Sequence, residues 1–254
     1  MPQTHPFDLT GKRFLVTGAA SGIGKATAIA LSALGAELIL WDINEAALKA
    51  TASSCMKAVH TLAIDLKNTP GIRETLLNAA AEYGPVNGLV HAAGIPYISP
   101  LKSLSENKYM EVLQINTIAA LELAKAFNQK KVSGGANGSI VFISSVYALV
   151  GSAANTAYAM SKAALHGITK SLAIELSPKN IRVNCVAPGF VKTTMKANTD
   201  QLFNEERDEL LESLHPLGLG APEDVAYACA YLLSDAAKWI TGSIMNVDGG
   251  FTAK

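Results

Sequence analysis

Short apolar runs alternate with longer amphipathic runs along the chain. The short runs are rich in Val, Ile and Leu and often apolar on both faces, as expected for strands of a parallel sheet that is covered on both sides. They comprise Arg13–Thr17, Ala36–Trp41, Ala58–Ile64, Val86–His91, Ser139–Ile143, Ile181–Val186 and Ser243–Val247. The pattern therefore predicts seven parallel strands.

The longer runs have helical spacing and fall between these strands. They comprise Ile23–Leu34, Glu45–Ala52, Gly71–Glu82, Glu106–Gln129, Tyr158–Leu176, about Gln201–Leu214 and Pro222–Leu233. Repeated strand–helix units predict a doubly wound α/β sheet with right-handed crossovers. Because no linker, repeat or low-complexity tract interrupts the pattern, we predict one domain over residues 1–254, with a surface turn at Ser133–Gly138.

Composition narrows the class of protein further. The 254 residues are 49% hydrophobic and 17% charged, which excludes disorder and permits a sizeable core. Lys plus Arg equal Asp plus Glu at 21 each, so no charge excess favours nucleic acid or an anionic membrane. Three scattered cysteines, no apolar run of membrane-spanning length and no signal-like N-terminus lead us to expect a soluble, cytoplasmic protein without a metal site.

A glycine-rich segment, Thr17–Gly24, joins the first strand to the first helix. Glycines at 18, 22 and 24 allow a tight turn and a close approach of the backbone to a ligand. The N-terminus of the following helix offers free N–H groups and the positive end of its dipole, which suit a pyrophosphate. The spacing is GxxxGxG rather than GxGxxG, so a glycine-rich turn without a ligand remains an alternative.

An acidic residue, Asp42, ends the second strand, 18 residues after Gly24. A carboxylate at this place accepts hydrogen bonds from the hydroxyls of an adenosine ribose and repels a 2′-phosphate. No Arg or Lys lies beside it in the sequence or in the glycine segment. The sequence therefore predicts NAD(H) in preference to NADP(H), with a helix-capping Asp as the alternative.

Four polar residues are candidates for catalysis. Tyr158 and Lys162 are four residues apart on a helical pattern and share a face, and an ammonium group near a phenol lowers its pKa. Ser145 lies 13 residues before Tyr158, just after a strand, and Asn116 falls inside a predicted helix, where it needs a specific partner. The alternative for Tyr158 and Lys162 is a packed Tyr beside a solvated Lys. The alternatives for Ser145 and Asn116 are an ordinary loop hydroxyl and a satisfied core amide.

Taken together, these motifs resemble the short-chain dehydrogenase/reductase (SDR) family over nearly the whole chain. The resemblance rests on Thr17-Gly18-x-x-x-Gly22-x-Gly24, Asp65, Ala92-Ala93-Gly94, Asn116, Ser145, Tyr158-x-x-x-Lys162, Pro188-Gly189 and Gly242-x-x-x-x-Val247-Asp248-Gly249-Gly250. It implies a Rossmann-type sheet and an NAD(P)-dependent alcohol dehydrogenase or ketoreductase. The chain is similar to the 3-oxoacyl-acyl-carrier-protein (ACP) reductases within that family.

The resemblance also implies roles for individual residues. Tyr158 is the acid/base, Lys162 lowers its pKa and binds the nicotinamide ribose, Ser145 orients the substrate oxygen, and Asn116 holds a water that links Lys162 to solvent. The implied cofactor-binding residues are Gly18, Ser21, Gly22, Ile23, Gly24, Asp42, Asp65, Leu66, Ala92, Ala93, Gly94, Tyr158, Lys162, Pro188, Gly189, Val191 and Thr193. A homotetramer is implied as well, assembled through the predicted helices Glu106–Gln129 and Tyr158–Leu176 and the last strand.

The sequence leaves the substrate open. Residues expected near the cleft are mostly apolar, which suits a neutral alcohol or ketone: Ile95, Pro96, Tyr147, Val150, Phe190, Val191 and Met195. The charged segment 192–217 is expected to cover the cleft, and Lys130-Lys131 could serve an acidic carrier protein. His91 stands where the family usually has Asn. The alternatives are a 3-oxoacyl-ACP reductase, an NAD(H)-binding sensor or scaffold without catalysis, and a methyltransferase. A sugar, a polyol and a hydroxysteroid also remain open as substrates.

Overall fold

Seven parallel strands form a sheet in the order β3–β2–β1–β4–β5–β6–β7. The computed structural model describes residues 5–192 and 205–253. The strands are β1 (Arg13–Thr17), β2 (Glu37–Asp42), β3 (Val59–Ala63), β4 (Gly88–His91), β5 (Ser139–Ile143), β6 (Arg182–Pro188) and β7 (Ile244–Val247). The predicted seven-stranded, doubly wound parallel sheet is confirmed.

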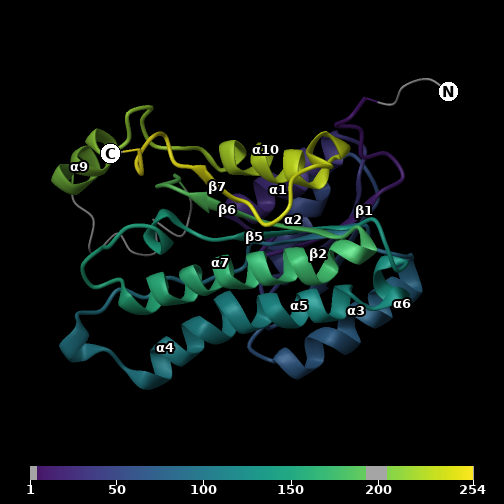
Figure 1. Ribbon diagram of the computed structural model, residues 1–254, viewed down its shortest axis with the longest axis horizontal. Coiled ribbons are helices and arrows are strands. Elements are labelled where there is room, and N and C mark those ends of the chain that lie inside the picture. The colour runs from purple at the N-terminus through teal and green to yellow at the C-terminus, as the bar shows by residue number, and fades with distance from the viewer. Residues whose placement is uncertain (1–4, 193–204, 254) are drawn as a thin grey trace.

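Helices cover both faces of this sheet (Figure 1). On one face lie α1 (Gly22–Ala33), α2 (Glu45–Ser53) and α10 (Pro222–Leu233). On the other lie α3 (Thr69–Tyr83), α4 (Glu106–Leu113), α5 (Ala119–Phe127), α6 (Lys130–Ser133) and α7 (Thr156–Leu176). Each face of the sheet has its own apolar core, and the side chains of β1 point alternately into one and the other. Leu15 packs with α3 and α5, whereas Phe14 and Val16 pack with α1 and α10. Burial on both faces explains the continuous apolar strands.

The order of the strands creates a switch point between β1 and β4. From β1 the chain winds outward to β2 and β3, then crosses back and continues from β4 on the other side of β1. The loops after β1 and β4 therefore diverge at the carboxyl edge of the sheet. Ligands of open α/β sheets bind at such a place, so the topology positions the candidate site there.

The predicted continuous helix Glu106–Gln129 is interrupted in the structure, so that prediction was wrong in its interior. Between α4 and α5 the chain forms a π-helical turn, Gln114–Ile118. The wider turn lets the consecutive buried residues Asn116 and Thr117 both bond α7 at Ser161, the first to its hydroxyl and the second to its carbonyl. Periodicity alone does not reveal an insertion of this kind, and such turns are frequent at functional sites.

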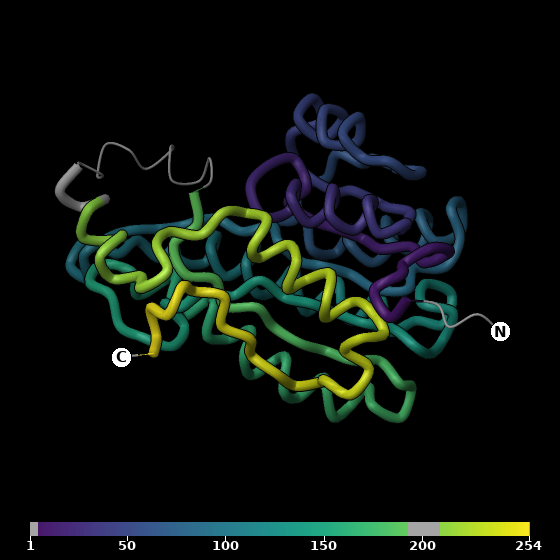
Figure 2. The backbone as a smooth tube through the Cα atoms, turned by 90° about the horizontal axis from the view of Figure 1, so that it is seen from above, coloured from purple at the N-terminus to yellow at the C-terminus, as the bar shows by residue number. Residues whose placement is uncertain are grey.

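Shorter elements complete the described part of the chain. They are α9 (Glu205–Ser213) and four 3₁₀ turns, η1 (Leu101–Ser103), η3 (Val146–Ala148), η4 (Ser177–Lys179) and η6 (Asp235–Ala237). Helix α9 and the C-terminal tail lie at the same end of the molecule, far from the N-terminus (Figure 2). Among the residues described, no helix is both long and apolar enough to cross a membrane.

Candidate active site

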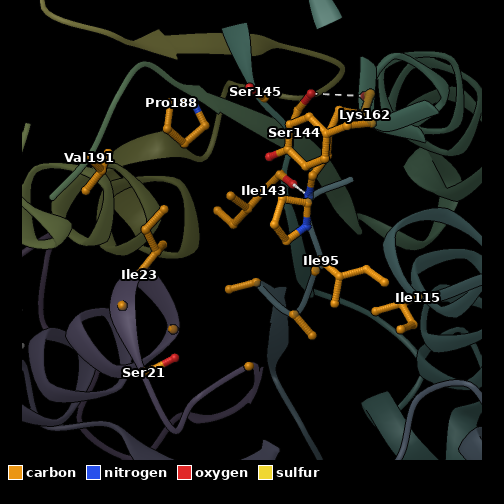
Figure 3. A pocket seen from close by; sticks show the side chains of 18 of the residues that line it. Ser21, Ile23, Ile95, Ile115, Ile143, Ser144, Ser145, Lys162, Pro188 and Val191 are labelled. Carbon is orange, nitrogen blue, oxygen red and sulfur yellow. Dashed lines mark hydrogen bonds between the residues drawn. The ribbon is translucent and has the colours of Figure 1, made fainter. Parts of the chain in front are cut away.

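A cleft of about 670 Å³ opens at the carboxyl edge of the sheet. In Figure 3, Ser21 and Ile23 lie on one side of the cleft and Lys162 and Ile95 on the other. All the predicted cofactor-binding residues that the structure describes line the cleft, as do Ser145, Tyr158 and Lys162. Thr193 lies outside the described residues, and Asn116 does not line the cleft. The parallel sheet thus brings together segments that are far apart in the sequence, such as Gly18 and Pro188, which are 170 residues apart.

The glycine segment after β1 has the close packing that a dinucleotide cradle needs. Gly18 has φ +68°, and a Cβ there would lie 2.7 Å from the backbone nitrogen of Ala93, after β4. A Cβ on Gly24 would lie 2.1 Å from the Gly18 carbonyl oxygen. Ser21 precedes α1 without capping it through its side chain, and the first turn of α1 carries no acidic residue. The N–H groups at this helix end, beside Ser21 and Gly22 of the cleft wall, therefore fit a pyrophosphate.

Asp42 is held rigidly at the end of β2. One carboxylate oxygen accepts the N–H of Ala20 and the other accepts the N–H of Asn44, both at 3.0 Å. The carboxylate therefore braces the glycine segment and keeps free lone pairs toward the cleft, where the ribose of a dinucleotide would lie. The nearby Lys67 of the cleft wall forms an ion pair with Glu111 of α4. Sequence reasoning missed this pair, because nothing in the α4 pattern distinguishes Glu111 from a solvated helix residue.

Tyr158 and Lys162 extend from α7 toward the end of β5. Lys162 Nζ donates a hydrogen bond to the Ile143 carbonyl oxygen at 2.8 Å and lies 5.7 Å from the centroid of the Tyr158 ring. Ser145 begins the turn η3 directly after β5, where its Oγ accepts the N–H of Tyr147 at 3.2 Å. Residues from a helix and from a strand end thus present a phenol, a hydroxyl and an ammonium group to one end of the cleft.

Burial dominates the ionisation of these groups. It raises the pKa of Tyr158 to about 12, although a hydrogen bond with the Ser145 hydroxyl acts in the opposite direction. It lowers the pKa of Lys162 to about 8. The sequence predicts a lowered phenol pKa, but desolvation of the phenolate outweighs that effect here. Tyr158 consequently holds its proton throughout the neutral pH range.

Asn116 is fully buried behind the cleft. Its Oδ1 accepts the N–H of Ile95 at 2.9 Å, and its Nδ2 donates to the Ile95 carbonyl at 3.1 Å and to Ser161 Oγ at 3.0 Å. Both amide hydrogens are thereby used, so the side chain would bind the water that the resemblance implies through the second lone pair of Oδ1. The contacts fix the loop after Gly94, and the expected partner of this mid-helix Asn is the backbone of Ile95.

His91 is also buried, at the end of β4. Its Nδ1 lies 2.9 Å from Thr17 Oγ1 and its Nε2 lies 3.2 Å from the Ile115 carbonyl oxygen. Because a carbonyl can only accept, Nε2 carries the proton and Nδ1 accepts from the Thr17 hydroxyl. Burial lowers the pKa of His91 to about 3, so the ring is neutral. His91 thus joins β1 to the π-helical turn and does not line the cleft.

Most of the apolar residues that the sequence places near the cleft do line it. These are Ile95, Pro96, Tyr147, Phe190 and Val191. Val150 is not part of the lining, and Met195 lies outside the described residues. No group of three or more His, Cys, Asp or Glu side chains that could hold a metal occurs within residues 5–192 and 205–253.

The fold and the cleft together define a dinucleotide-dependent oxidoreductase of the α/β class. A family model described as enoyl-(acyl carrier protein) reductase matches residues 18–252. The chain belongs to the short-chain dehydrogenase/reductase family, whose members bind a nicotinamide cofactor.

Individual relatives cover nearly the whole chain. The 3-oxoacyl-[acyl-carrier-protein] reductase of Thermotoga maritima is 36% identical over 246 residues, which is 95% of this chain and 98% of the relative. L-rhamnose 1-dehydrogenase (NAD(P)(+)) of a Sphingomonas species is 37% identical over 250 residues, 95% of this chain and 96% of the relative. A Beutenbergia cavernae crystal structure with bound NADP, described as an NAD(P) dependent gluconate 5-dehydrogenase, has a TM-score of 0.91 and 32% identity, and the match covers 98% of this chain and 100% of that one. These names differ in substrate, and the two that print a cofactor give NAD(P).

Proposed function

We propose that the protein transfers a hydride between NAD(H) and a secondary alcohol or ketone. The observation that carries the proposal is the convergence of Tyr158, Ser145 and Lys162 at one end of a cleft whose other end holds the glycine segment and Asp42. A catalytically silent sensor has no need of this convergence, and a methyltransferase has no need of a Tyr and a Lys on one face of α7. When bound, the nicotinamide ring supplies or accepts the hydride.

In the proposed mechanism, residues of this chain transfer the proton and stabilise the charges that form. During reduction, negative charge grows on the substrate oxygen, and Tyr158 donates its phenolic proton there while the Ser145 hydroxyl donates a hydrogen bond to the same oxygen. Lys162, as an ammonium group, stabilises the phenolate that remains and binds the nicotinamide ribose. Asn116 acts indirectly, by fixing the Ile95 backbone beside the cleft.

The ionisation of Tyr158 gives the reaction a directional pH dependence. Oxidation of an alcohol needs the phenolate, whose fraction rises about tenfold per pH unit below the pKa of about 12. Reduction needs the protonated phenol, which is present throughout the neutral range. It also needs the ammonium form of Lys162, which is lost as pH rises through about 8. We therefore expect oxidation to accelerate from pH 6 to 9 while reduction stays level and then declines. Steady-state rates in both directions test this, and a level oxidation profile contradicts it.

Asp42 is proposed to select NAD(H). Its carboxylate would bind the ribose hydroxyls and would face the 2′-phosphate of NADP(H), and the Lys67 ammonium on that side is already paired with Glu111. We expect Asp42→Ala to weaken NADH binding by about 10- to 100-fold, the value of one or two hydrogen bonds to a charged group, and to reduce discrimination against NADPH. Fluorescence titration with both cofactors measures this. Tighter binding of NADPH than NADH by the unmodified protein would contradict the proposal.

Reduction of a 3-oxoacyl-ACP thioester is the second candidate, supported by the Thermotoga maritima relative. Lys130 and Lys131 do not favour it. They lie in α6, which precedes β5 at the amino edge of the sheet, on the opposite side from the cleft. Turnover of a 3-oxoacyl thioester compared with simple ketones distinguishes the two candidates.

We propose a homotetramer as the assembly. The exposed large apolar side chains include Met110, Met160 and Ile174 on α4 and α7, and Tyr227 and Trp239 on α10 and after η6, where Trp239 is 95% exposed. Exposed apolar groups gathered on helix faces are typical of interfaces. We expect light scattering at micromolar concentration to give four chains, and Met160→Glu with Ile174→Glu to give smaller species. A monomeric unmodified protein would rule the tetramer out.

Two further properties belong to the same proposal. The segment 192–217 is proposed to cover the cleft. Of its described part, Lys192 and Leu211 line the cleft, whereas residues 193–204 lie outside the described residues. A cytoplasmic location is supported by the free thiols of Cys55, Cys185 and Cys229, which suit a reducing compartment.

A further inference from the structure

Two aromatic rings meet at a right angle on the cleft wall beside Tyr158. Tyr147, in η3, and Phe190, after β6, have ring centroids 5.6 Å apart and planes at 89° to each other. Both are partly exposed and line the cleft, and Tyr147 is close enough to Tyr158 to disfavour its phenolate. We call this pair the aromatic corner. A flat ring placed against it stacks on one aromatic face while it stands edge-on to the other, and both are favourable geometries.

The Phe190 side of the corner is fixed from behind by His215. The Phe190 N–H donates to His215 Nε2 at 3.2 Å, and His215 Nδ1 donates to the Leu211 carbonyl oxygen at 2.6 Å. The ring of His215 is buried and stacks on Phe251, with centroids 4.8 Å apart. Phe251 in turn lies 6.2 Å from Phe190. Contacts from α9 and from the C-terminal tail therefore hold Phe190 in place, which lowers the entropy lost when a ligand packs on it.

Most of the other described residues that line the cleft after β4, β5 and β6 are apolar, although Ser144, Asn155 and Lys192 also line it. The apolar lining includes Ile95, Pro96, Ile98, Leu211 and Leu219. Among the described residues, the acidic side chains that line the cleft do not face the aromatic corner. Asp42 and Asp65 follow β2 and β3, on the far side of β1, and Glu111 is paired with Lys67.

Two cations remain at the end of the cleft that holds the aromatic corner. Lys162 is buried and donates to the Ile143 carbonyl, and Lys192 is exposed. A carboxylate or a polyol packed against the aromatic corner and the Ile95–Pro96 wall would lose hydration at these apolar surfaces, whose side chains supply no hydrogen-bonding group except the Tyr147 hydroxyl.

We propose that the aromatic corner selects an uncharged substrate in which a flat aromatic ring adjoins the carbonyl or carbinol carbon. This inference rests on the proposed function and narrows its substrate class. Ser145 and Tyr158 bind the oxygen, and the ring substituent lies between the aromatic corner and the Ile95–Pro96 wall. The sugar and sugar-acid names of the relatives describe substrates that this surface disfavours.

The test compares matched ketones with NADH. Acetophenone carries the ring, 4-acetylbenzoate adds a charge to it, fructose replaces it with hydroxyls, and butan-2-one lacks it. We expect kcat/KM for acetophenone to exceed that for 4-acetylbenzoate and fructose by at least about 100-fold, since burying an unpaired polar group is penalised more than losing a methylene.

Two variants, Phe190→Ala and Phe190→Leu, test whether the aromatic corner causes the preference for a ring. Both variants remove the flat face, and Phe190→Leu keeps an apolar side chain to support the fold. We expect the acetophenone to butan-2-one ratio of kcat/KM to fall by about 10-fold or more, the usual effect of truncating a well-packed aromatic anchor. Leu101→Ala is the matched control, because Leu101 is exposed in η1 and does not line the cleft. It should leave the ratio unchanged.

The outcomes separate the inference from the proposed function. Preference for 4-acetylbenzoate or fructose, or an unchanged ratio in both Phe190 variants, overturns the inference and leaves the oxidoreductase intact. If no ketone is reduced although NADH binds, the proposed function fails. Saturation-transfer NMR of acetophenone with the NADH complex then tests the inference separately. If acetophenone binds the unmodified protein and Phe190→Ala abolishes this binding, the aromatic corner is supported. If acetophenone does not bind, the inference is overturned.

Discussion

Tyr158→Phe is expected to reduce turnover by a factor of about 10² to 10⁴, the range for loss of a positioned general acid or base. The substitution removes only the hydroxyl that would exchange a proton with the substrate oxygen. The ring stays in place, because its position on α7 depends on packing and on the helix backbone. The dissociation constant for NADH should therefore change by no more than about twofold, which corresponds to less free energy than one hydrogen bond contributes. Steady-state kinetics on a ketone and fluorescence titration with NADH give the two values.

Ser145→Ala is the companion variant for this prediction. It removes the second hydroxyl directed at the same oxygen and should lower kcat by a smaller factor, of about 10². The pH dependence of oxidation should disappear in Tyr158→Phe, because the group that titrates is gone, but persist in Ser145→Ala. Near-normal turnover in both variants would show that the proton follows another route, and the mechanism would have to be abandoned.

Gly18→Ala is expected to weaken NADH binding by at least about 100-fold, the effect of displacing a binding group by about 1 Å. The new Cβ would lie 2.7 Å from the backbone nitrogen of Ala93, so the loops after β1 and β4 must separate. These loops form the two sides of the switch point where the pyrophosphate and the nicotinamide would lie. The positive φ of Gly18 adds backbone strain of about 1–3 kcal/mol. Titration with NADH and thermal unfolding measure the two effects.

Gly11→Ala is a matched control for this variant. Gly11 also has a positive φ, +77°, but a Cβ there meets nothing within 4 Å. It should show a similar loss of stability from backbone strain and normal NADH binding. If both variants bind NADH equally well, the close approach of the Gly18 and Ala93 loops is not needed for the cofactor.

Much of the site could be read from the sequence because a parallel sheet places all its strand carboxyl ends at one edge. Once the strands are recognised, the residues that follow them must meet. Gly18, Asp42, Asp65, Gly94, Ser145 and Pro188 all line one cleft for this reason. The four-residue spacing of Tyr158 and Lys162 is likewise a local property of α7. Motif order and strand periodicity therefore determined the fold and the membership of the cleft.

The tertiary structure alone decided what depends on burial and on long-range contacts. Desolvation raises the pKa of Tyr158, whereas the sequence shows only a neighbouring Lys that should lower it. Asn116 is fixed on the Ile95 backbone behind the cleft because a π-helical turn, invisible to periodicity, directs it there. Lys130 and Lys131 lie at the opposite edge of the sheet from the cleft.

The aromatic corner is the clearest case of what the sequence could not show. Tyr147, Phe190, His215 and Phe251 belong to four segments that are up to 104 residues apart, and no spacing rule connects them. Local patterns specify which element a residue joins and which face it occupies, since these depend on backbone repeats of two and 3.6 residues. The partners of a loop side chain depend on how the loops pack after the sheet has formed, so only the tertiary structure decided them.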